Sequence, residues 1–177
     1  IADRMHGFVE QSATVKKMFE EGARLKAIHG DNNVFDFSLG NPDLPPPPEF
    51  AQALRDLISD QTISHGYMPS AGHLSARKTV ADQLSQIHGI EFTPEKLIMT
   101  VGASGALNNV LKALVNPGDE ILTPAPFFVG YRQYAFVAEA ELATVPTAEG
   151  FKLDLSTMQV AITPKTRVVL INSPNNP

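Results

Sequence analysis

The sequence predicts an α/β fold in three layers, in which helices cover both faces of a mostly parallel sheet. The first observation behind this prediction is that short apolar runs of strand length alternate with helical segments from residue 97 onward. The second is the largely apolar run RVVLIN at residues 167–172, which is typical of a strand buried on both faces. This alternation implies βαβ units with right-handed crossovers.

The composition narrows the class of protein. The chain has 177 residues, of which 43% are hydrophobic and 19% are charged, so a globular core is expected. A net charge of −5 without a basic block argues against nucleic acid as a partner, and no apolar run approaches the length needed to span a bilayer. The lack of cysteine excludes disulfides and thiolate chemistry. With no signal peptide at its start, the chain is expected to be cytoplasmic, without a membrane partner.

The N-terminal part is expected to form two helices joined by an arm. Residues 12–29 have apolar positions at helical spacing, with Ser12 as N-cap and a glycine after the end. Residues 34–39 alternate like a half-buried strand. Four prolines, residues 45–48, predict a rigid spacer rather than a recognition ligand, and this spacer leads into a helix over residues 49–59.

The next part is expected to be a loop followed by a helix. Residues 62–73 have weak periodicity and carry Tyr67, and apolar residues recur at helical spacing over residues 74–87. Three histidines lie in this region: His65, His73 and His88. They share no metal-ligand spacing with an acidic residue, so no metal site is predicted.

Residues 97–115 are the stretch around which the chain is organised. An apolar run at 97–101 predicts a strand, the small residues 102–105 predict a tight turn, and an amphipathic helix is expected from Ala106 onward. Free N–H groups and the helix dipole make such a helix start a site for an anion, above all a phosphate. The alternative is a turn that is small only for packing, because neither GxxxxGK[ST] nor GxGxxG is present.

Regular elements continue toward the C-terminus. Further strands are expected at residues 120–123 and 142–146. Helices are expected over residues 128–138 and from Asp154, a candidate N-cap, to residue 162. In open α/β sheets ligands bind outside the carboxyl ends of the strands, so the segments that follow the strands are the candidates for a site.

These segments, residues 102–105, 124–128 and 172–177, hold the unusual residues of the chain. The first offers backbone donors for an anion, the second offers two aromatic rings on a proline-stiffened turn, and the third offers asparagine amides. Together they predict a pocket for a flat, phosphorylated ligand whose ring lies against Phe127 or Phe128. Core packing is the alternative role of these rings.

Five segments identify a family by their order and spacing: SLGNPD (38–43), GYMPSAGHLSAR (66–77), TVGASGAL (100–107), TPAPFFVGY (123–131) and INSPNNP (171–177). The chain resembles the N-terminal part of a class I/II aminotransferase, a pyridoxal-phosphate enzyme of the aspartate aminotransferase fold (fold type I). The resemblance covers essentially the whole chain and less than half of such an enzyme. It implies an N-terminal helix and arm over residues 1–48 and a truncated large cofactor-binding domain over residues 49–177.

For the cofactor, pyridoxal 5'-phosphate, the resemblance implies a site at the start of the central helix. Ala103 and Ser104 would hold the phosphate, and Gly102 would allow the turn. Phe128 would stack on the pyridine ring, with Phe127 as the second candidate.

The resemblance implies further contacts from other parts of the chain. Gly40 would bring its backbone to the substrate carboxylate. Asn176 would hydrogen-bond the ring hydroxyl oxygen of the cofactor and also contact that carboxylate. Tyr67 would reach the cofactor phosphate of the neighbouring subunit, which implies a homodimer with shared active sites.

The resemblance also implies that the family's catalytic groups lie beyond Pro177: the Schiff-base lysine, the acid that keeps the ring nitrogen protonated, and the arginine that binds the substrate carboxylate. The lysines of the chain sit outside the family's lysine context: Lys16, Lys17, Lys26, Lys78, Lys96, Lys112, Lys152 and Lys165. The full-length parent is expected to exchange an amino group between an α-amino acid, aspartate-like or of broad range, and a 2-oxo acid. The 177 residues alone are expected to be inactive.

Other functions stay open at this point. A pyridoxal-phosphate-dependent C–S β-lyase shares these N-terminal motifs. A non-catalytic aminotransferase-like ligand-binding domain of a transcription regulator would be a sensor, although no basic helix-turn-helix arm precedes Ser12. A generic nucleotide-binding module would need a glycine fingerprint that the sequence lacks.

Overall fold

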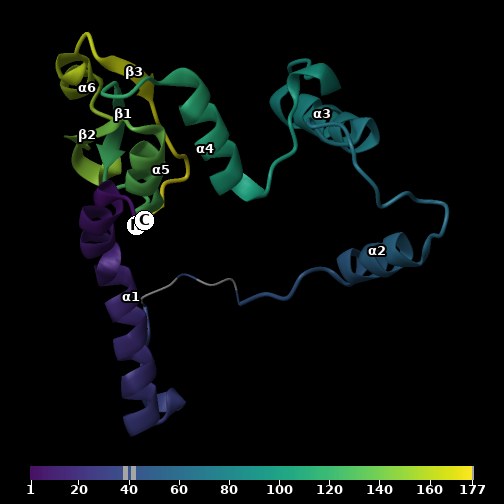
Figure 1. Cartoon of the computed structure of the whole chain (residues 1–177), viewed down its shortest axis with the longest axis horizontal. Coiled ribbons are helices and arrows are strands. Elements are labelled where there is room, and N and C mark those ends of the chain that lie inside the picture. The colour runs from purple at the N-terminus through teal and green to yellow at the C-terminus, as the bar shows by residue number, and fades with distance from the viewer. Residues whose placement is uncertain (38–39, 41–42, 177) are drawn as a thin grey trace. The chain divides into compact units, whose positions relative to one another are not determined.

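The structure, a computed structural model, describes residues 1–37, 40 and 43–176, and it describes residues 10–16 by their backbone alone. The chain divides into two compact units, residues 1–65 and 66–177, whose helices and strands are labelled in Figure 1. The predicted domain division at residue 48 stays a prediction, because these units reflect contacts within this chain only.

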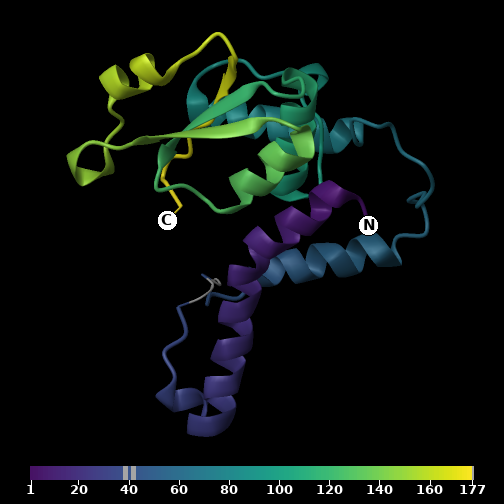
Figure 2. The same cartoon turned by 60° about the vertical axis from the view of Figure 1, so that its left-hand side comes forward.

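The first unit begins with one long helix, α1 (Asp3–His29), drawn in purple in Figures 1 and 2. The predicted N-cap at Ser12 is wrong, because the helix starts earlier and its N-cap is Ala2. The early start is reasonable, since the residues before Ser12 contain no proline and Asp3 lies in the first turn, where a negative charge is favourable. The helix ends at Gly30, whose φ of 83° is accessible to glycine.

The segment after α1 differs from its prediction. A 3-10 turn, η1 (Asp31–Asn33), is followed by residues 34–37, which form no strand; residues 38 and 39 of the predicted strand lie outside the described residues. A strand requires a hydrogen-bonded neighbour, and this run has none within the described part of the chain. An ion pair of 2.9 Å between Lys26 Nζ and Asp36 Oδ2 ties it to α1 instead. The helix α2 (Pro48–Ser59) then begins with a proline at its first position, close to its prediction.

The second unit contains the predicted parallel sheet. Its strands are β1 (Glu120–Ala125), β2 (Glu141–Pro146) and β3 (Thr166–Val169), in the order β2-β1-β3. The central strand β1 pairs in parallel with both neighbours, and Glu120 is in register with Glu141 and Thr166. Strand β3 is shorter than predicted, although Leu170 N–H still donates to Leu122 O at 2.8 Å. The carboxyl ends of all three strands therefore lie at one edge of the sheet.

Helices cover both faces of this sheet. The helix α5 (Gly130–Ala138) connects β1 to β2, and α6 (Leu155–Ala161) connects β2 to β3. The chain moves from the centre of the sheet to one edge and then back across it to the other edge. Crossovers of one hand place helices on opposite faces when this direction reverses. Helix α6 starts at the predicted N-cap, Asp154, which accepts hydrogen bonds from the N–H groups of Ser156 and Thr157.

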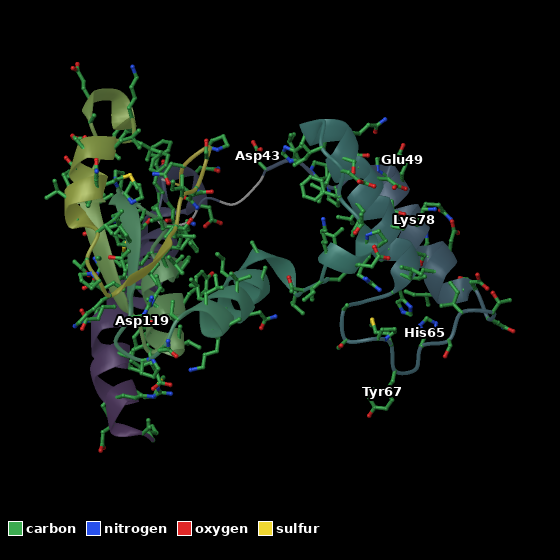
Figure 3. The ribbon with its side chains drawn as sticks, turned by 90° about the horizontal axis from the view of Figure 1, so that it is seen from above. Asp43, Glu49, His65, Tyr67, Lys78 and Asp119 are labelled. Carbon is green, nitrogen blue, oxygen red and sulfur yellow. The ribbon has the colours of Figure 1, made fainter. Side chains whose placement is uncertain are left out.

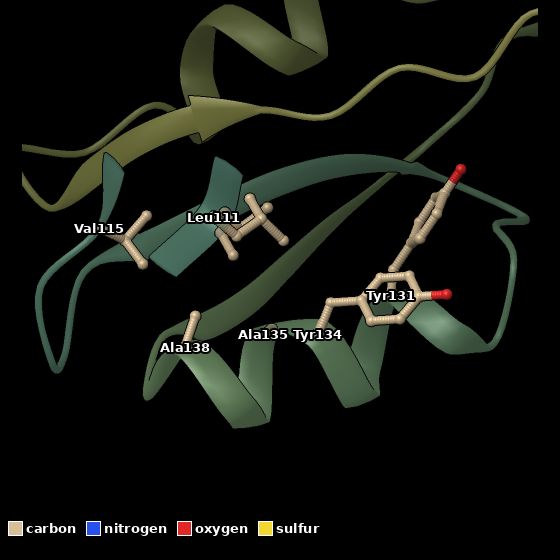
Figure 4. Packing of buried hydrophobic residues seen from close by; sticks show 7 residues of the cluster. Leu111, Val115, Tyr131, Tyr134, Ala135 and Ala138 are labelled. Carbon is tan, nitrogen blue, oxygen red and sulfur yellow. The ribbon is translucent and has the colours of Figure 1, made fainter. Parts of the chain in front are cut away.

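Two core clusters lie on the two faces of the sheet. On one face Ile121 packs against α5 and α4 (Gly102–Leu114), with Leu111 as the buried contact from α4 (Figure 4). On the other face Leu122 packs with Met158 of α6. Adjacent residues of β1 thus point to opposite faces, as in any strand. This arrangement confirms the predicted three-layer α/β fold.

The predicted strand over residues 97–101 is wrong. The helix α3 (Leu74–His88) and a 3-10 turn, η2 (Pro94–Lys96), lead into a segment that is extended without being a strand. A backbone hydrogen bond of 2.9 Å from Met99 N to Ala71 O ties its middle to the loop before α3. The apolar pattern correctly indicated an extended conformation, but no neighbouring strand is present among the described residues to form a ladder.

Candidate functional site

The start of α4 lies where the sequence predicts the anion site. Gly102 is the first residue of α4 and has a φ of +66°, a conformation that glycine adopts without strain. The predicted turn over residues 102–105 is therefore the first turn of the helix itself. No side chain among the described residues caps this end, and both Ala103 and Ser104 are exposed. An uncapped helix start leaves first-turn N–H groups without an intrahelical partner, which suits an anion.

Thr100 fixes the backbone at this helix start. Gly102 N–H donates to Thr100 O at 3.0 Å, and Thr100 Oγ1 donates to Gly102 O at the same distance. These two hydrogen bonds join the extended segment to the helix. The sharp turn into α4 is thus determined by a glycine with a positive φ and by the hydroxyl two residues before it.

Ser104 makes the most informative contact of the site. Its Oγ lies 2.6 Å from the hydroxyl oxygen of Tyr134, a short hydrogen bond in which either oxygen can be the donor. Tyr134 belongs to α5 and is only 7% exposed. The prediction missed this residue. A signal for it existed in the sequence, because Phe128, Tyr131 and Tyr134 are spaced by three within the predicted helix over residues 128–138.

These three aromatic residues form a continuous row of rings, hereafter the aromatic row. The Phe128 ring meets Tyr131 edge-on, with centroids 5.7 Å apart at 80°, and Tyr131 lies 6.4 Å from Tyr134. Figure 4 shows the tyrosine hydroxyls on the side away from the aliphatic end of the core at Val115 and Ala138. The row joins the predicted stacking residue at one end to a tyrosine that contacts the predicted phosphate residue at the other.

Both candidate rings of the second segment are partly buried and pack against the core. The Phe128 ring also occupies the space that a Cβ on Gly130 would need. Phe127 stacks on Tyr131 with centroids 6.3 Å apart at 11°, and the Arg132 guanidinium lies 5.2 Å from the Phe127 centroid. Core packing, the alternative role predicted for these rings, is therefore present for both of them.

The asparagine segment is tied to the aromatic segment. Asn175 Nδ2 donates to Pro126 O at 2.8 Å, which links the end of β3 to the turn after β1. A cavity of about 170 Å³ lies beside this link. Its lining includes Thr123, Tyr131, Thr147, Phe151, Asn172 and Asn175. Since pockets for drug-sized ligands have about 300–1,000 Å³, this cavity accounts for only part of such a site. Asn176, the predicted cofactor contact, is exposed.

Two predicted site residues are not brought to this edge by any described contact. Tyr67 is fully exposed, and Figure 3 shows its ring pointing away from the ribbon of its loop. Gly40 lies in the first unit and is exposed, with open space where a Cβ would be. The residues on either side of Gly40 lie outside the described residues. The roles predicted for Tyr67 and Gly40 stay predictions.

The aromatic row includes a tyrosine whose pKa is shifted. Burial, reinforced by the neighbouring Tyr134, raises the pKa of Tyr131, so its hydroxyl is a neutral donor at neutral pH.

The part of the chain that the structure describes contains no group of three or more histidine or acidic side chains placed to hold a metal ion. Across those same residues, none of the helices has the length and apolar character needed to cross a membrane.

The residues present fit pyridoxal phosphate. Uncapped N–H groups and the Ser104 hydroxyl suit the anionic phosphate oxygens, and an aromatic ring held by its neighbours suits a flat pyridine. The exposed amide of Asn176 suits the ring hydroxyl. Each group comes from the predicted segment, and the aromatic row connects the first two.

Comparison with known proteins gives consistent results. The fold matches the crystal structure of an aminotransferase from Eubacterium rectale with a TM-score of 0.92 and 35% identity, over 100% of this chain and 46% of the other. The sequence is 38% identical to a probable aspartate/prephenate aminotransferase of Thermus aquaticus, over 98% of this chain and 46% of the relative. It is 34% identical to a probable N-succinyldiaminopimelate aminotransferase of Mycobacterium tuberculosis, over 88% of this chain and 40% of that relative.

The chain thus spans less than half the length of the curated relatives that it matches. The family model for aminotransferase class I and II matches residues 32–177, which include all three candidate segments. The chain therefore belongs to the class I and II aminotransferases, whose cofactor is pyridoxal phosphate.

Proposed function

We propose that the full-length protein transfers an amino group between an α-amino acid and a 2-oxo acid with pyridoxal phosphate. The observation that carries this proposal is the aromatic row, which connects Ser104 at an uncapped helix start to the ring of Phe128. An anion site and an aromatic platform on one rigid core are what a flat, phosphorylated cofactor requires. Family membership supports the same reading.

The residues of this chain bind and orient the cofactor. The N–H groups of Ala103 and Ser104, together with the Ser104 hydroxyl, donate to the phosphate, and glycine at position 102 permits the positive φ at the helix start. The Phe128 ring lies on one face of the pyridine, and Asn176 donates its amide to the ring hydroxyl oxygen. When bound, the cofactor withdraws electrons from the substrate α-carbon and so makes its proton acidic.

The substrate is an amino acid with an aspartate-like side chain, or a broad range of amino acids. Support comes from relatives whose names specify aspartate/prephenate or N-succinyldiaminopimelate, each of which carries a carboxylate besides the one common to all α-amino and 2-oxo acids. In this chain the backbone of Gly40 and the amide of Asn176 would contact the α-carboxylate. Neither group contacts the substrate side chain, so Gly40 and Asn176 would bind only the α-carboxylate that all amino-acid substrates share.

We also propose a homodimer in which Tyr67 donates its hydroxyl to the cofactor phosphate of the partner subunit. Its complete exposure is what such a role requires before a partner is present. Sedimentation equilibrium of the full-length protein should give twice the monomer mass. Tyr67→Phe should weaken pyridoxal-phosphate binding without changing the free energy of unfolding, since an exposed hydroxyl contributes little to the fold.

The lysine that carries the cofactor lies outside residues 1–177 in this proposal, and the 177 residues alone do not transaminate. The experiment is borohydride reduction of the cofactor-loaded full-length protein followed by peptide mass mapping. Modification at one of the eight lysines of this chain would contradict the proposal.

Function itself is tested with the full-length protein, aspartate and 2-oxoglutarate. Transamination yields oxaloacetate and glutamate in equal amounts, and a panel of other amino acids then measures the range. Release of ammonia and a 2-oxo acid without a new amino acid would indicate a lyase instead. A protein that binds the cofactor but converts no substrate in the panel would refute the enzymatic proposal.

A further inference from the structure

The hydrogen bond between Ser104 and Tyr134 joins the start of α4 to the middle of α5, across 30 residues of sequence. The two partners differ in environment, because Ser104 is exposed while Tyr134 is 7% exposed. Their 2.6 Å separation is at the short end for two hydroxyl groups. A buried tyrosine hydroxyl that is bonded to a serine hydroxyl of an anion site can control how that serine presents its proton.

We propose that Tyr134 is a positioning residue of the phosphate site: it donates to Ser104 Oγ and thereby directs the Ser104 hydroxyl proton to the cofactor phosphate. This inference rests on the proposed cofactor site and adds to it a residue that touches neither cofactor nor substrate. A serine hydroxyl has one proton and two acceptor positions. When Tyr134 fills one acceptor position, the serine proton is left for the anion.

The direction of the hydrogen bond follows from the anion. Without a ligand, either oxygen can be the donor. A phosphate at the helix start accepts hydrogen bonds and supplies none when it is fully ionised, so the Ser104 proton turns toward it. The Ser104–Tyr134 contact then survives only if Tyr134 donates. The tyrosine has no comparable alternative acceptor among the described contacts, so this arrangement satisfies both hydroxyls.

The backbone of Ser104 is held independently of its side chain. Asn108 Nδ2 donates to Ser104 O at 2.9 Å, one helical turn along α4. Removing the Tyr134 hydroxyl therefore leaves the peptide N–H donors of the first turn in place and frees only the serine rotamer. The expected loss is restricted to the hydroxyl donor of the phosphate site.

The test uses three ligands of the full-length protein: pyridoxal phosphate, pyridoxal without its phosphate, and inorganic phosphate. Tyr134→Phe keeps the buried ring and removes the hydroxyl. It should weaken binding of pyridoxal phosphate and of inorganic phosphate by about fivefold each, the equivalent of one hydrogen bond, and leave pyridoxal affinity within about twofold. Ser104→Ala should weaken the two phosphate ligands at least as much. The double variant should bind them no more weakly than Ser104→Ala, because Tyr134 acts through Ser104.

The outcomes separate the inference from the proposed function. If wild type binds inorganic phosphate but not pyridoxal phosphate, the cofactor proposal fails, and the phosphate titrations still decide the role of Tyr134. If Tyr134→Phe weakens pyridoxal as much as pyridoxal phosphate, the residue acts through general packing and the inference is overturned. Additive losses in the double variant would overturn it as well, and so would a wild type that binds no phosphate ligand. A urea unfolding curve of each variant shows whether the fold is kept.

Discussion

Substitution of Gly130 by alanine would disturb the ring proposed to stack on the cofactor. Gly130 is the first residue of α5, and a Cβ built there overlaps the Phe128 ring, with further ring atoms 3.0 and 3.1 Å away. Carbon atoms do not approach so closely, so either the ring or the helix start must shift. The ring is the more mobile of the two, since it is only partly buried while Gly130 itself is buried.

The size of the effect can be worked from three contributions. Forcing a methyl group into this packed region costs about 1–3 kcal/mol. Moving Phe128 off the edge of Tyr131 loses part of an aromatic contact of about 0.5–1.5 kcal/mol. Replacing glycine by alanine returns less than the about 0.5–1 kcal/mol of a helix interior, because Gly130 is the first residue of α5. The free energy of unfolding should therefore fall by about 1–3 kcal/mol, and pyridoxal-phosphate affinity should fall about two- to tenfold through the displaced ring.

Urea unfolding and absorbance titration of the full-length protein measure the two effects. Gly7→Ala is the matched control, because Gly7 lies within α1 and a Cβ there would meet nothing within 4 Å. This control should raise the free energy of unfolding by about 0.5–1 kcal/mol and leave cofactor binding unchanged. If Gly130→Ala unfolds at the same urea concentration as wild type and binds the cofactor equally well, the Phe128 ring is not held as the structure indicates.

Two further predictions concern a glycine and a helix cap. Gly102→Ala should lower the free energy of unfolding by about 1–2 kcal/mol, because the φ of Gly102 is +66°. Gly105→Ala is the control and should not lower it, because a Cβ there would meet side chains no nearer than 3.6 Å. Equal effects of the two substitutions in urea unfolding would contradict this prediction. Hydrogen bonds from the Ser156 and Thr157 hydroxyls, assisted by their N–H groups, lower the pKa of Asp154 from 3.8 to about 2. Stability from this cap is thus present above about pH 4 and is lost as pH falls through 2. Asp154→Asn should flatten that part of the urea-midpoint profile, and an unchanged profile would count against it.

The fold was largely predictable because its strongest signals are local. The α6 cap at Asp154 and the glycine at the end of α1 each act within a few residues, so the sequence displays them directly. The parallel sheet was predictable for a related reason. Strands that are separated by helices cannot pair as hairpins, so their order of appearance restricts the topology.

The two strands that were predicted wrongly depend on partners. Residues 34–37 and 97–101 both have the composition of a strand, and the second is extended as expected. Composition describes the preference of one segment, whereas a strand exists only when another segment supplies the ladder. No partner is present for either run among the described residues, so the pattern alone could not decide.

The sequence predicted the segments of the candidate site but not the contacts between them. The roles of Ala103, Ser104 and Phe128 were assigned from motifs that each lie on one short piece of chain. Tyr134 carries no motif, and its relevance arises only when α5 packs against α4 and brings its hydroxyl to Ser104. Spacing places a residue on a helix face, but the identity of the opposite face requires the tertiary structure.

The contacts between these segments also determine how ordered the site is before a cofactor binds. Two of the three candidate segments follow β1 and β3, and Ile121 and Leu122 of β1 are completely buried. Ser104 is hydrogen-bonded to Tyr134, which is part of the buried core, and Asn175 is hydrogen-bonded to the Pro126 carbonyl in the turn after β1. A phosphate and a pyridine ring would therefore meet donors and a ring that packing has already placed, so little binding free energy is lost in ordering them. It follows that this part of the site depends on the α4, α5 and β1 core more than on any ligand-induced movement.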